Sequence, residues 1–213
     1  MGKLFFYSDQ VVESPGNRRL DNILLANKDL KSIKIGYIPS TDDKEKIFFN
    51  TKVKYYRNYG ITNIMYFDLY DEFNSVKINE LIQCDIIHLS AGDPIKFREA
   101  IKQRNMEIVL NNYYKQGGTI VGVSGGAVQL GISTKLFQMF IGDKRSGKST
   151  LQLVEFEFLP HYNRWNDKYK TEVHNYAKTS GTTVYAGNAG DGIIVEDNKV
   201  QIVGDIVVIS GNE

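Results

Sequence analysis

One serine stands in a pattern that could make it a nucleophile. Ser124 lies in residues 122–126 (GVSGG), directly after the apolar run 119–123 and directly before residues of helical character. G-x-S-x-G between a strand and a helix is the nucleophile-elbow pattern, in which a sharp turn lifts the serine side chain clear of the sheet. The helix that follows directs free N–H groups at the same place, so the Gly125 amide could hold an oxyanion. These five residues alone fit a glycine-rich turn with an incidental serine equally well.

A second turn of small residues precedes a helix start in residues 89–94 (LSAGDP). Asp93 followed by Pro94 is typical of a helix cap and a first helical residue. In a parallel sheet, ligands collect at the carboxyl ends of the strands, so this turn and the Ser124 turn should face one crevice. We therefore expect the Gly92 amide to be a second oxyanion donor beside Gly125.

A serine nucleophile needs a general base, and the chain has three histidines. His88 lies within the apolar run 86–89 and is expected to be buried, whereas His174 lies among polar residues and is expected on an exposed helix face. His161 directly follows Pro160 at the end of a predicted strand, so the backbone aims it. We predict that His161 is the base.

Alternating strand and helix patterns supply the elements that must position these residues. The strand candidates are apolar along most of their length, which indicates burial on both faces. Helices are predicted over residues 44–59, from Asp93 onward, and up to residues 116–118. The sequence thus predicts an α/β three-layer sandwich with a mostly parallel central sheet flanked by helices. Its expected strands cover residues 3–7, 33–38, 63–67, 85–89 and 119–123.

In the last third of the chain, the alternation of strand and helix patterns gives way to strand patterns at close spacing. One helix over about residues 167–179 interrupts them. We expect these antiparallel or mixed C-terminal strands to extend the same sheet, with a hairpin formed by 192–196 and 200–203. Because no linker or repeat is evident, one domain over residues 1–213 is predicted. The strand candidates are residues 151–159, 183–187, 192–196, 200–203 and 206–210.

Taken together, these segments resemble the peptidase E and cyanophycinase family of serine peptidases, which shares the α/β fold of class I glutamine amidotransferases. The similar segments are 35–41 (IGYIPST), 89–93 (LSAGD, like "SGGN"), 122–127 (GVSGGA, like "GxSAGA") and 159–163 (LPHYN, like "PHY"). The resemblance runs nearly the whole chain. It implies that Ser124 is the nucleophile, that His161 is the base and that the Gly92 and Gly125 amides form the oxyanion hole. It also implies a small peptide substrate, with an N-terminal aspartate as the leading candidate.

Three positions depart from the family pattern. Gly125 replaces an alanine, which we expect to add only flexibility, and Ala91 replaces a glycine, a minor change. The third catalytic member is an aspartate in peptidase E, and its position here holds Met139, which cannot orient an imidazole. Other residues would have to take its place. The candidates are Asp143, Glu155, Glu157, Asn163 and Asp191.

The departure at Met139 leaves a second interpretation open. A protein of the same fold could bind a peptide or metabolite without catalysis, because an unoriented base leaves the serine inactive. In the peptidase interpretation, Arg164 near His161 is a candidate partner for a substrate carboxylate.

A phosphate-binding motif also occurs, in residues 142–149 (GDKRSGKS), which match G-x-x-x-x-G-K-[ST] letter by letter. The motif acts only between a strand and a helix. Residues 136–141 are a strand candidate, but residues 150–159 also have a strand pattern. The interpretation that fits this context is a basic turn between two adjacent strands.

Composition excludes several functional classes. The 213 residues contain 26 Lys and Arg against 25 Asp and Glu, so there is no basic excess for nucleic-acid binding. The single cysteine, Cys84, allows neither an internal disulfide nor a cysteine-built zinc site, which favours a cytoplasmic location. No apolar run approaches a membrane span. We expect no metal or cofactor, a small peptide as substrate, and a homodimer as the candidate assembly.

Overall fold

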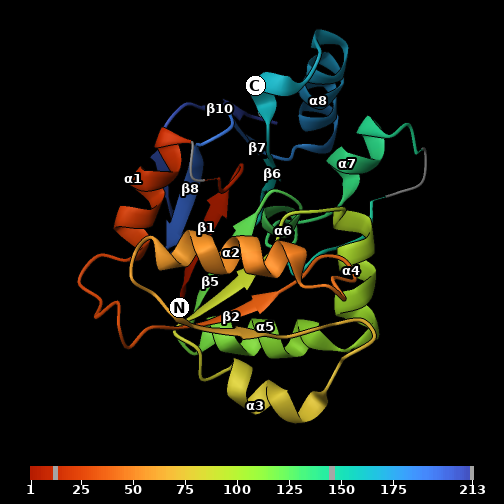
Figure 1. Ribbon diagram of the computed structural model, residues 1–213. Helices are drawn as coiled ribbons and strands as arrows, with labels where there is room; N and C mark the ends of the chain where they lie inside the picture. Colours follow the sequence, from red (N-terminus) through yellow and green to blue (C-terminus); the bar gives the residue numbers. More distant parts are fainter. Residues whose placement is uncertain (12–13, 144–146, 212–213) are drawn as a thin grey trace.

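The computed structural model describes residues 1–11, 14–143 and 147–211. Its central feature is a sheet with the strand order β3-β2-β4-β5-β1-β8-β9 (Figure 1). The five strands from β3 to β1 are parallel to one another, β8 is antiparallel to β1, and β9 is antiparallel to β8. The strands are β1 (Lys3–Tyr7), β2 (Lys34–Ile38), β3 (Asn63–Tyr66), β4 (Ile86–Leu89), β5 (Thr119–Val123), β8 (Gly192–Glu196) and β9 (Lys199–Val203).

Both faces of this sheet are covered by helices, because successive side chains of a strand point to opposite faces. On β1, Leu4 and Phe6 belong to one buried cluster, and Phe5 and Tyr7 belong to the other. The first cluster is shared with α4 (Pro94–Gln103), α5 (Met106–Lys115) and α6 (Gly125–Val128), and the second with α1 (Pro15–Leu24) and α2 (Ile47–Arg57). The predicted α/β fold, with a mostly parallel sheet between helix layers, is confirmed.

Local signals in the sequence account for two of the predicted turns. The Asp93 carboxylate caps α4 by accepting hydrogen bonds from the N–H groups of Ile95 at 2.8 Å and Lys96 at 3.1 Å. Between β8 and β9, Asp197 and Asn198 both have positive φ, at 50° and 59°. Two consecutive left-handed residues are the requirement of a type I′ hairpin turn. The predicted helix start and the predicted hairpin are therefore both present.

A smaller second sheet lies beside the first, in the order β10-β7-β6. It packs with α7 and α8 around its own apolar cluster, which contains Leu136, Leu159, Tyr169 and Val184. The expectation that all C-terminal strands extend the main sheet is therefore wrong for three of them and right for β8 and β9. The additional elements are β6 (Glu157–Leu159), β7 (Val184–Gly187), β10 (Ile206–Ile209), α7 (Lys135–Phe140), α8 (Asp167–Ser180) and the short helices α3 (Ile78–Leu81), η1 (Ser75–Lys77) and η2 (Tyr162–Arg164).

Two further strand predictions need correction. Only the end of residues 151–159 is a strand, because the N–H groups of Leu151, Gln152 and Leu153 donate to carbonyls of residues 129–131 instead of to a strand. Residues 135–140 form α7, not a strand. No described helix is long and apolar enough to cross a membrane.

With these corrections, the phosphate-binding motif does not lie between a strand and a helix, as its function requires. The motif at 142–149 follows a helix, lies partly outside the described residues and has no helix in residues 147–156 after it. The Lys148 ammonium forms an ion pair with Glu99.

Candidate active site

Ser124 stands at the carboxyl end of β5, at the turn into α6. Its φ of 51° and ψ of −112° lie outside the regions that L-residues ordinarily occupy. The backbone is fixed there because the Ser124 N–H donates to the Tyr7 carbonyl at 2.9 Å and its carbonyl accepts from the Val128 N–H at 3.1 Å. Such a conformation costs about 1–3 kcal/mol and persists where its surroundings enforce it, which is typical of functional sites.

His161 reaches the serine from the second sheet. β6 ends at Leu159, Pro160 follows, and His161 adopts a left-handed conformation with φ 60°. Its N–H donates to the Ser8 hydroxyl oxygen at 2.7 Å, and that hydroxyl donates to the Gly187 carbonyl at 3.0 Å. The histidine backbone is thereby fixed to the end of β1 and to β7, as well as to its own strand.

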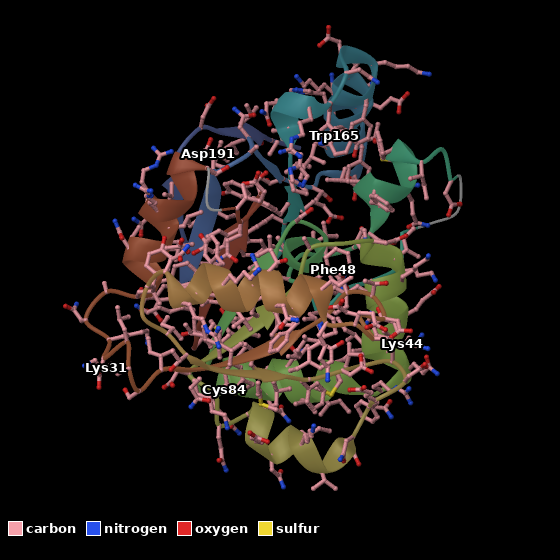
Figure 2. All side chains as sticks on the ribbon, in the orientation of Figure 1. Lys31, Lys44, Phe48, Cys84, Trp165 and Asp191 are labelled. Atoms are coloured by element: carbon pink, nitrogen blue, oxygen red, sulfur yellow. The ribbon has the colours of Figure 1, made fainter. Side chains whose placement is uncertain are left out.

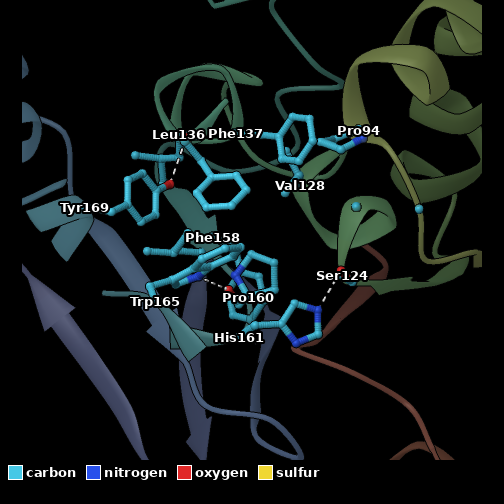
Figure 3. A pocket seen from close by; sticks show the side chains of 14 residues that line it. Pro94, Ser124, Val128, Leu136, Phe137, Phe158, Pro160, His161, Trp165 and Tyr169 are labelled. Carbon is cyan, nitrogen blue, oxygen red and sulfur yellow. Dashed lines mark hydrogen bonds between the residues drawn. The ribbon is translucent and has the colours of Figure 1, made fainter. Parts of the chain in front are cut away.

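The two side chains meet in a hydrogen bond. Ser124 Oγ lies 2.9 Å from His161 Nε2 (Figure 3). This is the distance at which a general base can accept the proton of a nucleophilic hydroxyl. Burial is the main cause that lowers the pKa of His161, the nearby Arg164 lowers it further, and Asp9 raises it. The imidazole is therefore held in its neutral form, in which Nε2 can act as an acceptor.

The other ring nitrogen, His161 Nδ1, is buried and has no hydrogen-bond partner within the described part of the chain. The residues considered for the third catalytic position are engaged elsewhere. Glu157 accepts a hydrogen bond from Ser133 at 2.5 Å, Asp191 pairs with Arg19 at 2.9 Å, and Asn163 accepts from the Ala189 N–H at 3.0 Å. Glu155 is exposed and lines a groove with β8 and β9, and Asp143 lies beside Gln138, so neither has a described contact with His161. Met139 packs against the apolar cluster of the second sheet.

The carboxylate whose charge acts on His161 is one that the sequence analysis missed, Asp9. It directly follows Ser8, the residue that holds the His161 backbone, and it is 8% exposed. Its oxygens accept from the Gly190 N–H at 2.7 Å and lie 3.4 Å from the Arg164 guanidinium. Its position two residues beyond β1, the neighbour of the Ser124 strand, was the available signal.

The two predicted oxyanion donors lie against each other beside Ser124. A Cβ on Gly125 would lie 2.0 Å from the Gly92 carbonyl oxygen, so the two turns touch backbone to backbone. The Gly92 turn is clamped from the other side, since the Ser40 N–H donates to the Ser90 hydroxyl at 2.8 Å and the Ser40 hydroxyl donates to the Ala91 carbonyl. The expectation that Gly125 adds only flexibility is thus corrected. Glycine is required there because of the close approach.

The other two histidines lie away from the reaction centre, and Arg164 lies near His161 but faces Asp9. His88 is fully buried on β4, stacks on Tyr37, and has its pKa held well below the usual range by burial. His174 is exposed on α8. The Arg164 side chain is mostly exposed and faces Asp9.

Two cavities open on either side of the Ser124–His161 pair, and both side chains line both of them. The first, which we call the aromatic cavity, has a volume of about 90 Å³ and is lined by Leu136, Phe137, Phe140, Phe158, Trp165 and Tyr169 beside Gly92 and Gly125 (Figure 3). The second, which we call the Lys52 cavity, has a volume of about 270 Å³ and includes Asp9, Gln10, Thr51, Lys52 and Ser90. A substrate bond placed at Ser124 would thus have an apolar environment on one side and a charged one on the other.

Lys52 is a site residue that sequence reasoning did not identify. Its ammonium donates to the Gln10 carbonyl at 3.0 Å and to the Gln10 side-chain oxygen at 2.7 Å, and it forms no ion pair among the described residues. Burial lowers its pKa to about 8. Its Nζ also lies 4.7 Å from the centre of the Tyr55 ring, so its described partners are neutral and no described carboxylate pairs with its charge.

Comparisons with known proteins identify the fold and the family of the chain. A candidate peptidase E from Listeria monocytogenes EGD-e has a similar structure, with a TM-score of 0.73 and 18% identity over 99% of this chain and 98% of that chain. A peptidase from an acI-B1 Actinobacterium has a TM-score of 0.76 and 14% identity, over 99% of this chain and 91% of that one. No curated protein sequence matches the chain. The sequence pattern of peptidase family S51 matches residues 5–203, and the chain therefore belongs to this family of serine peptidases.

Proposed function

We propose that this serine peptidase hydrolyses small peptides with Ser124 as nucleophile and His161 as general base. The observation that carries the proposal is the 2.9 Å hydrogen bond between Ser124 Oγ and His161 Nε2 at the strained end of β5. A hydroxyl is a weak nucleophile at neutral pH, and an adjacent neutral imidazole supplies the acceptor that it needs.

The reaction then follows the acyl-transfer route. Ser124 Oγ attacks the peptide carbonyl carbon while its proton passes to His161 Nε2, and the carbonyl oxygen becomes an oxyanion beside the Gly92 and Gly125 amides. The imidazolium returns the proton to the leaving amine, and the C–N bond breaks. Water, deprotonated by the same imidazole, then cleaves the acyl-enzyme and restores the Ser124 hydroxyl.

Asp9 takes the place of an orienting acid in this proposal. Its carboxylate stabilises the imidazolium through space, because it raises the pKa of His161 without a hydrogen bond to Nδ1. The orientation of the ring is supplied by the backbone instead, through the His161 N–H bond to Ser8.

An acidic group on the substrate fits the Lys52 cavity. The Lys52 ammonium lines the same cavity as Ser124 and forms no ion pair with a described carboxylate. A peptide with an N-terminal aspartate would supply such a carboxylate. In this arrangement Lys52 replaces Arg164 as the candidate partner, since Arg164 faces Asp9.

The test is covalent labelling by a fluorophosphonate probe, which reacts with activated serines. The wild-type protein should be labelled, Ser124→Ala should not, and Ser75→Ala, at an exposed serine of η1, should be labelled like wild type. Equal labelling of wild type and Ser124→Ala, both folded by circular dichroism, would refute the assignment.

The unpartnered Nδ1 of His161 supports a second candidate function, a binding protein without turnover on the same fold. It predicts that the wild-type protein binds dipeptides but neither reacts with the probe nor releases amino acids from a dipeptide library.

A cytoplasmic location and a homodimer remain part of the proposal, and light scattering on the purified protein tests the dimer.

A further inference from the structure

The aromatic cavity is unusual for a site that handles polar peptide bonds. Every side chain that lines it apart from Ser124 and His161 is apolar or aromatic. Phe140 and Trp165 pack with ring centroids 4.3 Å apart, and Trp165 contacts Tyr169 at 5.4 Å. The polar atoms of the two amphipathic rings are already satisfied, since Trp165 Nε1 donates to the Pro160 carbonyl at 2.8 Å and the Tyr169 hydroxyl donates to the Leu136 carbonyl at 2.7 Å. Beyond the catalytic pair, the side chains of the cavity therefore offer a ligand only apolar contact.

The rigidity of its walls indicates a preformed site. Leu136, Phe158 and Tyr169 are almost fully buried and belong to the apolar clusters of the two sheets. Among the side chains of the lining, Phe140 alone is largely exposed, at 44%, and it forms the outer rim on α7. An exposed aromatic rim above buried apolar walls is typical of a preformed pocket that binds an apolar group.

Size limits what the pocket can hold. Its volume of about 90 Å³ is smaller than the about 150 Å³ of an apolar cavity that accommodates benzene. One aliphatic side chain fits, and a larger part of a peptide does not. Ser124 and His161 form one wall, so the residue that carries this side chain must flank the bond under attack.

We propose that the aromatic cavity is a specificity subsite for an aliphatic side chain of about leucine size, carried by a residue that flanks the scissile bond. This inference rests on the proposed function of Ser124. It adds a preference for an aliphatic side chain in the substrate, which the Lys52 cavity does not determine. Burial of such a side chain favours leucine over the isosteric asparagine by about 10- to 100-fold in binding or in kcat/KM.

The first experiment measures binding without turnover. Trp165 is the only tryptophan of the chain, so its fluorescence reports on this cavity alone. Folded Ser124→Ala protein is titrated with Asp-Leu, Leu-Asp, Asp-Asn and Asn-Asp, which covers both sides of the scissile bond. A saturable blue shift with at least one leucine peptide, about 10-fold tighter than with its asparagine counterpart, is the expected result. Equal responses to leucine and asparagine peptides would overturn the proposal.

The second experiment measures hydrolysis with matched variants. Phe140→Ala removes the rim of the aromatic cavity, and Phe48→Ala makes the same change at an exposed residue that lines the Lys52 cavity. Phe48 lies on α2 and is labelled in Figure 2. Phe140→Ala should reduce the leucine-to-asparagine ratio of kcat/KM by about fivefold or more, and Phe48→Ala should change that ratio by less than about twofold. An unchanged ratio in Phe140→Ala, or an equal fall in both variants, would overturn the subsite.

The two experiments separate this inference from the proposed catalytic function. Leucine-selective binding to Ser124→Ala without any hydrolysis by the wild-type protein would retain the subsite and reject the peptidase assignment. Hydrolysis that depends on Ser124 but proceeds equally on leucine and asparagine peptides would retain the peptidase and reject the subsite.

Discussion

Gly125→Ala should abolish most of the activity, although it restores the alanine of the pattern that this chain resembles. A Cβ at position 125 would lie 2.0 Å from the Gly92 carbonyl oxygen, where ordinary contact begins at 3.4 Å. The two turns must therefore separate by more than about 1 Å, because a backbone atom cannot rotate away as a flexible side chain does.

The turn that carries Ser124, and not the Gly92 turn, has to move away from this contact. The Gly92 turn cannot retreat, because a Cβ built on Gly92 already falls 2.0 Å from Ser40 Oγ, and Ser40 is hydrogen-bonded to Ser90 and Ala91. Movement of α6 displaces Ser124, whose N–H is bonded to the Tyr7 carbonyl. The substitution thus disturbs the nucleophile and the oxyanion hole together.

The expected magnitude follows from these displacements. A shift of about 1 Å in a reacting group costs about 10²-fold in rate, and loss of one oxyanion donor costs about 10²- to 10³-fold. We therefore expect the rate constant for fluorophosphonate labelling to fall about 10²- to 10³-fold. Overpacking should also lower the free energy of unfolding by about 1–3 kcal/mol.

The assay compares labelling rates at a temperature at which both proteins are folded. Gly117→Ala is the matched control, because Gly117 has a φ of +98° and nothing within 4 Å of the added Cβ. It should lose stability through backbone strain, by about 1–2 kcal/mol, and keep its labelling rate. A Gly125→Ala protein that is labelled at the wild-type rate would refute the argument from close approach.

Three further predictions concern titratable groups. Since burial and Arg164 lower the pKa of His161 below 6.5, kcat/KM should fall only as the pH drops through a value below 6.5, and an acid limb at or above 6.5 would contradict the proposed base. Asp9→Asn removes the charge that raises this pKa, so the limb should move to lower pH and the maximal rate should fall about 10-fold, less than the ~10⁴-fold of a directly hydrogen-bonded acid. Burial raises the pKa of Glu157 from 4.5 to about 7, so this group stabilises the fold in its protonated form, and ionisation at pH well above 7 costs about 3 kcal/mol. Glu157→Gln should therefore gain in Tm relative to wild type as the pH increases from about 4.5 to about 7 and keep a constant advantage above that, and a pH-independent difference over this range would count against it.

Most of the main sheet was predictable because its strands carry their own signals. Runs such as 119–123 are apolar on both faces, and Asp93 with Pro94 marks a helix start that the structure shows in hydrogen bonds. Residues 151–156 were mispredicted because β-type residues need a partner strand, and the N–H groups of residues 151–153 bond to carbonyls of residues 129–131 instead. That pairing is a tertiary contact, so residue propensity carries no signal for it.

The candidate site divides in the same way. Ser124 and His161 could be predicted because the local backbone positions each side chain. The G-x-S-x-G motif marks Ser124, and the proline that ends a strand marks His161. Asp9 and Lys52 could not be ranked, since their importance depends on which distant residues surround them. Lys52 lies within α2, where a lysine is ordinarily solvated, and only the fold turns it into the cavity beside Ser124.

Helix α7 links the missing acid to the aromatic cavity. The same six residues carry Met139, at the position expected for the third catalytic member, and Leu136, Phe137 and Phe140, which line the cavity. Met139 packs, partly buried, against the apolar cluster around Leu159, so an ionised carboxylate there would lose part of its hydration among apolar side chains. A segment that builds an apolar wall beside the histidine is therefore an unfavourable place for its acid. The charge that raises the pKa of His161 comes instead from Asp9, which follows Ser8 beyond the end of β1.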